Sequence, residues 1–415
     1  MHARLRGAIV IAAAMIPGRA IAQPSAPAPA ATADRPADDS GAPVVPAVPR
    51  APDASPPTAP PASPPAGQPA SPPAGIEPRF QWSPFGYLRV QYIAVQNDPN
   101  SAFVGRDDGF ELQNARLGVR GTLEHRVAFV VAFDGAVDER LQINRPDGKL
   151  RVGLRDAFVD VVLTGPVVAR GGFFHAFVDP EALVPDTRRE LVDEPIESRG
   201  VRATEGFETA GLTPGRSLGA AIRIDPEPPG SGARLGFELA VQNGADELSS
   251  NNDNDKPAFS ATVLARLPHD SWVMVAGRYN PRSFGDLPFR QDEDDLQGTA
   301  GLHVVVGPIA LGGGVIAQRT TYSTTGGPSQ TAFGGHGQVM FALPTPLPLA
   351  IGYRFGILDP SSLITTDRVM EHTAGAVLAV PRYRMRVQLQ VTHVIEQAAR
   401  ELANDRAQLA AELDL

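Results

Sequence analysis

Arginine is the residue type in this chain with the most chemistry to offer. Of the 37 basic residues, only Lys149 and Lys256 are lysines. The guanidinium group carries a fixed positive charge, and its forked donors suit the oxygens of phosphate and carboxylate groups. A GC-rich genome would also enrich arginine, so the position of each arginine carries more information than the number. Arg384 and Arg386 are two residues apart, which is the repeat of a β-strand.

The segment from Tyr383 to Val391 shows what this spacing means. Its apolar residues alternate with Arg384, Arg386 and two glutamines. Alternation over this length predicts a strand with one apolar and one polar face. The same pattern predicts sixteen strands, at 85–95, 110–123, 126–135, 154–163, 167–177, 216–225, 233–243, 257–267, 271–279, 296–306, 309–319, 331–343, 348–357, 369–380, 383–393 and 405–415.

The connections between these segments alternate in length. Glu124-His125 and Gly307-Pro308 are short, whereas 178–215 and 280–295 are long. Tight turns at one rim and longer loops at the other are typical of bacterial outer-membrane barrels. The last segment alternates up to Leu415, as pairing between the first and last strands requires. Residues 79–415 are therefore predicted to form an all-β, transmembrane antiparallel β-barrel of about sixteen strands.

The first 78 residues have a different composition. A basic start, the apolar stretch 7–16 and Ala20-Ile21-Ala22 predict a cleaved signal peptide over residues 1–22. The stretch is too short for the alternative, a membrane anchor. Residues 23–78 are rich in proline and alanine and are predicted to be a disordered linker. Export by this route and a barrel domain together predict a location in the bacterial outer membrane, in contact with its lipid.

The polar faces of the predicted strands should line a water-filled lumen, since a barrel of this size is wide enough for one. Their arginines are Arg89, Arg116, Arg120, Arg170, Arg223, Arg266, Arg354, Arg384 and Arg386. The acids expected on the same faces are Asp134, Asp156, Asp160 and Glu238. Pairing between the two sets is one interpretation, and the excess of arginine over acid favours a pore that prefers small anionic solutes.

The net charge of −9 does not contradict this preference. Many acids fall in predicted loops, such as Asp246-Glu247 and residues 292–295. An acidic chain does argue against a nucleic-acid partner.

The longest predicted loop, from Val178 to Gly215, is expected to fold into the lumen and narrow it, since loops of this length are usually functional. Its expected constriction residues are Arg188, Arg189, Glu190, Glu194, Glu197 and Arg199. Opposed charges across a narrow passage would produce a transverse electric field that sorts solutes.

Several motifs resemble the phosphate-selective porin O/P family. They are NARLGVRGTL (114–123), GGFFHAFVDPEAL (171–183), PIESRG (195–200) and PGRSLG (214–219). The resemblance implies a 16-stranded, trimeric outer-membrane porin with an inward third loop and a phosphate site rich in lysine. The chain departs from the family at Phe174, where lysine is usual, and at Ala176, where proline is usual.

Two other functions were weighed against a diffusion channel. An enzyme would need a serine, a histidine and an acid at a recognisable spacing, and the chain shows none, so no enzymatic activity is expected. No metal or cofactor is expected either. The remaining alternative is a structural or adhesive barrel with a plugged lumen and no channel activity.

Overall fold

The computed structural model describes residues 79–105, 108–136, 151–202, 204–224, 234–244, 252, 254–284, 290–323, 329–397 and 401–415. The predicted signal peptide (1–22), the predicted linker (23–78) and the acidic pair Asp246-Glu247 lie outside the described residues. No helix in the described part of the chain is long and apolar enough to cross a membrane.

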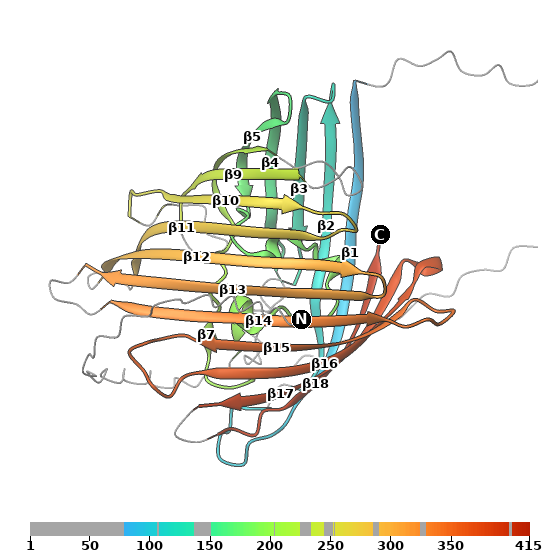
Figure 1. Cartoon of the computed structure of the whole chain (residues 1–415), viewed down its shortest axis with the longest axis vertical. Helices are drawn as coiled ribbons and strands as arrows, with labels where there is room; N and C mark the ends of the chain where they lie inside the picture. Colours follow the sequence, from blue (N-terminus) through green and yellow to red (C-terminus); the bar gives the residue numbers. More distant parts are fainter. Residues whose placement is uncertain are drawn as a thin grey trace, which may run out of the picture. The chain divides into compact units, whose positions relative to one another are not determined.

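Sixteen antiparallel strands form one closed barrel (Figure 1). They are β1 (Phe80–Val95), β2 (Gly109–Leu123), β3 (Val127–Asp134), β4 (Gly153–Thr164), β5 (Val167–Phe174), β8 (Ser217–Ile224), β9 (Arg234–Gln242), β10 (Ala258–Arg266), β11 (Trp272–Phe284), β12 (Gln291–Val306), β13 (Ile309–Tyr322), β14 (Gln330–Ala342), β15 (Leu349–Asp359), β16 (Val369–Val380), β17 (Met385–Glu396) and β18 (Arg406–Asp414).

The first and last strands close the barrel. β1 pairs with β18 over nine residues, from Tyr87 opposite Asp414 to Val95 opposite Arg406. Every other barrel strand pairs with its neighbours in the order of the chain, and β5 pairs directly with β8. The predicted all-β antiparallel barrel of about sixteen strands is thus confirmed.

The two faces of each strand differ as the alternation predicts. On β17, Leu389 and Val391 are exposed on the outer surface, whereas Gln388 and Gln390 are fully buried inside. On β1, Leu88 is exposed and Arg89 is buried. An apolar outer face fits lipid, because an arginine facing the middle of a bilayer would cost about 2–4 kcal/mol.

In the described part of the barrel, the register shifts in three strand pairs, and two of these β-bulges, in the β1–β2 and β3–β4 pairs, bring additional residues to the lumen. In the β1–β2 pair, Arg89 is opposite Asn114 and Val90 is opposite Leu112, so Gln113 has no opposite residue. In the β3–β4 pair, Ala132 is opposite Asp156 and Phe133 is opposite Leu154, which leaves Arg155 as the extra residue. A bulge turns two successive side chains toward one face.

The short connections require left-handed backbone. Glu124 and His125 have φ values of 50° and 54°, and Gly165 and Gly307 have 51° and 59°. Such values fit the two-residue turns whose twist matches that of antiparallel strands. The predicted strand 383–393 begins later than expected, at Met385, because residues 381–383 form a 3-10 turn that ends with Arg384 at φ 51°.

The prediction that residues 292–295 lie in a loop is wrong. β11 extends to Phe284 and β12 begins at Gln291, so these acids are part of a strand. The strand is stable there because Arg282 pairs with Glu293 at 3.1 Å and with Asp295 at 2.8 Å. Runs of acids are usual in loops, but here cross-strand partners neutralise the inward ones.

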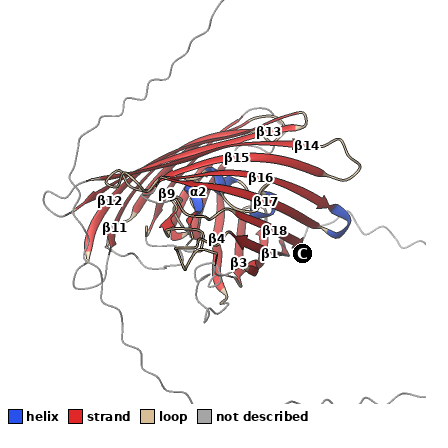
Figure 2. Ribbon diagram, turned by 90° about the horizontal axis from the view of Figure 1, so that it is seen from below, coloured by secondary structure: helices blue, strands red, loops and turns tan. Residues whose placement is uncertain are grey.

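Residues 175–216, which we call the inner loop, connect β5 to β8. They contain the short helices η1 (Pro180–Leu183), η2 (Asp186–Arg188) and α2 (Ile196–Arg199), and a ribbon of β6 (Gly200–Val201) and β7 (Thr209–Ala210). Figure 2 shows α2 beneath the arch of strands that includes β14 and β15, which it contacts. The inner loop therefore lies inside the barrel.

Candidate functional site: the lumen and its inner loop

The inner loop is first held against β9 and β10. The backbone N–H of Phe177 donates to Glu238 Oε1 at 2.9 Å, and Thr262 donates to the carbonyl of Phe177. Phe174, Ala176 and Val178 join an apolar cluster with residues of β8 to β11. Burial of these side chains from water stabilises the start of the loop.

The loop then crosses to the opposite wall. Arg354 of β15 donates to the carbonyl oxygens of Asp193 and Glu194, at 2.9 and 3.2 Å. Gln390 of β17 accepts from the backbone N–H of Val192 at 2.9 Å, and Gln388 donates to the carbonyl of Arg189. Buried backbone N–H and C=O groups need hydrogen-bond partners, and polar side chains of the barrel wall supply them to the loop in place of water.

Glycines on the inner wall let the loop approach closely. A Cβ atom added to Gly334 of β14 would lie 2.3 Å from Cβ of Glu197, and one added to Gly301 of β12 would lie 2.3 Å from Cγ of Pro180. Neither distance is tolerated by real side chains, because van der Waals contact between carbon atoms is at about 3.5–4.0 Å. These positions fix how far the loop sits from the wall.

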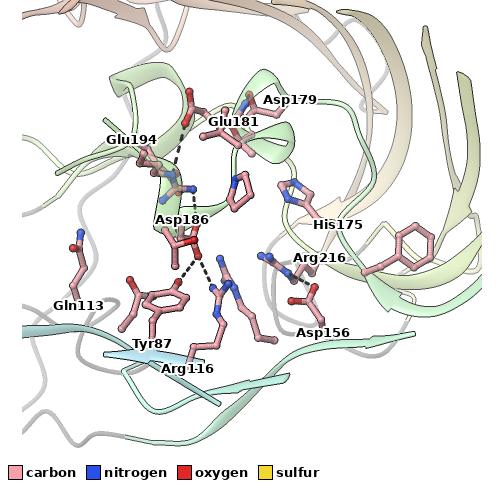
Figure 3. A pocket seen from close by; sticks show the side chains of 18 of the residues that line it. Tyr87, Gln113, Arg116, Asp156, His175, Asp179, Glu181, Asp186, Glu194 and Arg216 are labelled. Carbon is pink, nitrogen blue, oxygen red and sulfur yellow. Dashed lines mark hydrogen bonds and ion pairs between the residues drawn. The ribbon is translucent and has the colours of Figure 1, made fainter. Parts of the chain in front are cut away.

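A cavity of about 800 Å³ remains between the inner loop and the wall of β1, β2, β4 and β5 (Figure 3). We call it the first cavity. Nine arginines and seven aspartates or glutamates line it. The arginines are Arg116, Arg120, Arg155, Arg170, Arg189, Arg199, Arg202, Arg216 and Arg384. The lining therefore carries an excess of positive charge.

Asp186 of the inner loop is the central acid of this cavity. It accepts a hydrogen bond from Tyr87 at 2.6 Å and pairs with Arg116 and Arg189 at 2.7 and 2.8 Å (Figure 3). Burial alone would raise its pKa, but Arg189, Arg116 and Arg155 outweigh this effect and hold the pKa well below its usual range. The loop is consequently joined to the barrel wall by an acid that stays ionised.

Asp179, which precedes η1, behaves in the opposite way. Burial, reinforced by the nearby charge of Glu181, raises its pKa to about 7. It accepts hydrogen bonds from the backbone N–H of Glu181 at 3.0 Å and from Thr213, so it ties the two ends of the inner loop together. This carboxyl changes charge near neutral pH.

The predicted lumen arginines fall into three groups. Arg116, Arg120, Arg170 and Arg384 line the first cavity, Arg223, Arg266 and Arg354 line a second cavity, and Arg89 and Arg386 contact the inner loop.

Most of these arginines have acidic partners. Arg170 forms two hydrogen bonds with Asp160, at 2.7 and 2.8 Å. Arg89 and Arg386 share Glu412, at 2.7 and 2.9 Å. Arg384 is exposed and pairs at 3.3 Å with Asp414, at the end of β18.

The six predicted constriction residues all have places in the inner loop, but not at one point. Arg189 pairs with Glu194 at 2.5 Å beside the first cavity. Arg188 and Glu190 line the second cavity. Glu197 bonds to His336 of β14, and Arg199 pairs with Glu371 of β16 at 2.6 Å. Five of the six therefore line a cavity, and Glu197 fastens the loop to β14.

Some lumen residues escape strict alternation. Arg155 enters the first cavity through the bulge of β4, together with Asp156, whose partner is Arg216 at 2.9 Å. Gln113 enters through the bulge of β2. The acids Glu111 and Glu371 also face inward and were not among the acids expected there. Their alternation with apolar neighbours is the signal that could have placed them.

No family model matches the chain, and no curated protein matches it. Among solved structures, the chain is similar to the outer membrane channel DcaP of Acinetobacter baumannii, with a TM-score of 0.57 and 11% identity over 81% of this chain and 97% of that one. It is similar to an anion-selective porin from Comamonas acidovorans, with a TM-score of 0.56 and 12% identity over 81% and 100%.

In-vitro folded OmpT, an outer membrane protein of Vibrio cholerae, gives a TM-score of 0.54 and 10% identity over 81% of this chain and 98% of that one. At these identities the likeness shows a shared fold. The chain thus has a 16-stranded barrel fold like that of outer-membrane porins.

Proposed function

We propose that this chain forms a water-filled channel in the bacterial outer membrane and that small solutes, preferentially anions, diffuse through its first cavity. The observation that carries this proposal is the excess of arginines over carboxylates in the lining. Fixed positive charges in a narrow passage attract anions and repel cations. Phosphate is one candidate, because guanidinium groups offer paired donors to its oxygens. The anion-selective porin of similar fold supports the same direction.

The direct test is the zero-current potential of the purified protein in a planar lipid bilayer under a KCl gradient. We expect the zero-current potential of the wild type to have the sign that chloride preference produces. The potential of Arg120→Gln should be smaller than that of the wild type. Arg120 is exposed in the first cavity and lies 5.5 Å from the Phe85 ring. One unit charge about 10 Å from an ion in water changes the energy of the ion by roughly 0.4 kcal/mol, with opposite signs for an anion and a cation, so the anion-to-cation permeability ratio should fall about fourfold.

Lys256→Gln provides the matched control. It removes one positive charge from an exposed position in the β9–β10 connection. A permeability ratio that changes equally in both variants, or a cation-preferring wild type, would contradict the anion preference.

A plugged barrel is the second candidate. The middle of the inner wall of β17 is covered by its surroundings, since Gln390 and Thr392 are both 0% exposed. Such coverage is what a structural or adhesive barrel would show. If folded protein produces no ion current in a bilayer, this candidate is favoured over a channel.

Assembly and export belong to the same proposal. One of the similar structures is a trimer form of OmpT. We propose that this chain also forms a trimer. We further propose that residues 1–22 are cleaved on export and that the outer face of the barrel contacts outer-membrane lipid. Chemical cross-linking in membranes followed by electrophoresis would show a trimer band, and mass spectrometry of the mature N-terminus would locate the cleavage.

A further inference from the structure

A second cavity of about 820 Å³ lies on the other side of the η1–η2 segment of the inner loop. Both cavities are lined by Glu181, Val184 and Arg189, so this segment stands between them. The second cavity otherwise faces the inner walls of β8 and of β10 to β15. Its volume is within the range of about 300–1,000 Å³ that small-molecule sites occupy.

Two of the arginines that line this cavity have no side-chain partner among the described residues. Among its five arginines, Arg189 and Arg354 are committed to holding the inner loop. By contrast, neither Arg188 nor Arg266 forms a side-chain hydrogen bond or ion pair with any residue that the structure describes. One exposed and one half-buried guanidinium group, those of Arg188 and Arg266, favour an anionic guest, because an acid of the guest can supply the partner that the protein lacks.

The acids of the same lining are mostly engaged. Glu190 accepts from Gln338 at 2.5 Å, and Asp193 pairs with Arg406 at 3.6 Å. Glu181 lies 3.7 Å from Arg189. The fourth acid, Asp270, is in the exposed β10–β11 turn. The lining therefore carries two cations without an acidic partner among the described residues, and its one acid without a side-chain hydrogen bond or ion pair among them lies in the exposed turn.

Aromatic rings lie beside these cations. Trp272 is directly opposite Arg266 in the β10–β11 pair, and its ring stacks on His303 with centroids 6.2 Å apart and 21° between planes. On the opposite side, Arg223 lies over the ring of Phe177 at 5.0 Å. Leu183 of η1 adds an apolar surface. A simple inorganic anion gains nothing from such a wall, whereas a planar ring that carries a carboxylate gains from both parts.

We propose that the second cavity is a binding site for small aromatic carboxylates, with the carboxylate held by Arg188 and Arg266 and the ring against Trp272. The site differs from the diffusion path in the first cavity. It also does not depend on that path, because binding can be measured on protein that conducts nothing.

The chain has only two tryptophans, Trp82 and Trp272, and Trp82 is 61% exposed on the barrel surface. In full-length protein carrying Trp82→Phe, tryptophan fluorescence therefore reports on the second cavity alone. Benzoate is the probe, and acetate and inorganic phosphate are the comparisons. We expect a saturable change with benzoate at concentrations at which acetate and phosphate have no effect.

Arg266→Gln and Arg188→Gln, each added to Trp82→Phe, should each weaken benzoate binding about tenfold, as expected when a charge-assisted hydrogen bond is lost. The two variants lie on different elements, so misfolding of one does not remove the test, and weakening by either supports the site. Arg120→Gln, in the first cavity, is the matched control and should leave the curve unchanged. The site is ruled out if benzoate gives no saturable change, if acetate acts equally, or if both variants bind as the parent does.

Discussion

At the scale of single residues, the lumen separates acids by their surroundings. Asp186 lies among arginines and stays ionised, whereas Asp179 lies in a buried position near Glu181 and has a pKa of about 7. Two acids of one loop, seven residues apart, thus respond differently to pH. The first cavity holds a fixed negative charge from one and a variable negative charge from the other.

This difference predicts a pH-dependent ion preference. Asp179 is neutral below its pKa of about 7 and negative above it, so the first cavity gains a negative charge as pH rises. The anion-to-cation permeability ratio should therefore fall about fourfold between pH 5.5 and 8.5, by the same Coulomb estimate as for Arg120. Zero-current potentials at the two pH values measure this, and Asp179→Asn should show a flat profile. A wild-type slope retained in Asp179→Asn would assign the titration to another group.

At the scale of elements, the inner loop is positioned by the wall that it touches. α2 packs on β14 and β15, where Gly334 leaves no room for a side chain. On the side of β1 and β2, the loop segment between the two cavities is held by polar contacts of Asp186, with Tyr87 and with Arg116. Apolar packing therefore sets its distance from one wall, and charge sets its distance from the other.

Gly334→Leu should narrow the first cavity. The new side chain meets Glu197 and pushes α2 toward the arginine-bearing wall, so single-channel conductance should fall. Gly337→Leu is the matched control on the same strand, because a Cβ there meets nothing within 4 Å. Equal conductance of the two variants would show that α2 does not limit the passage.

Removal of residues 185–200 should have the opposite effect. This deletion takes out η2 and α2 while leaving every barrel strand intact, so conductance should rise. The slower electrophoretic migration of the protein after heating serves as a control that the barrel has folded. Unchanged conductance in folded protein would contradict a narrowing role of this segment.

The strands could be predicted from sequence because each carries its own evidence. Alternation in 369–380 gave the bounds of β16, and the end of β1 at Val95 was also predicted. The site could be predicted only in part, because pairing depends on residues far apart. Arg89 and Glu412 are separated by 323 positions, and nothing local connects them. Arg155 was missed because a bulge, set by the neighbouring strand, reverses the face of a single residue.

At the scale of the whole barrel, closure brings together charges from both ends of the chain. Glu412 of β18 binds Arg89 of β1 and Arg386 of β17, and Glu412 and Arg89 are almost completely buried. The seam between first and last strands is thus joined by side chains as well as by the backbone ladder. Loss of the shared acid would leave the buried Arg89 and the half-buried Arg386 without this carboxylate partner.

Glu412→Ala should consequently destabilise the barrel by about 3–5 kcal/mol, the usual effect of breaking a buried ion pair. Glu124→Ala is the control, because its pair with Arg79 is exposed and should contribute about 0–1 kcal/mol. Urea unfolding in lipid vesicles, followed by tryptophan fluorescence, measures both. Similar midpoints for the two variants would show that water, rather than Glu412, compensates the seam arginines.

The bulges of β2 and β4 also bear on how such a barrel can change through insertion and deletion. One additional residue in a regular strand would turn every later side chain to the wrong face. A bulge absorbs the additional residue locally, so Arg155 adds a charge to the lumen while Leu154 and Val159 remain exposed on the outer surface. A lumen can therefore acquire new polar groups through single-codon insertions, without any exchange of the residues that face lipid.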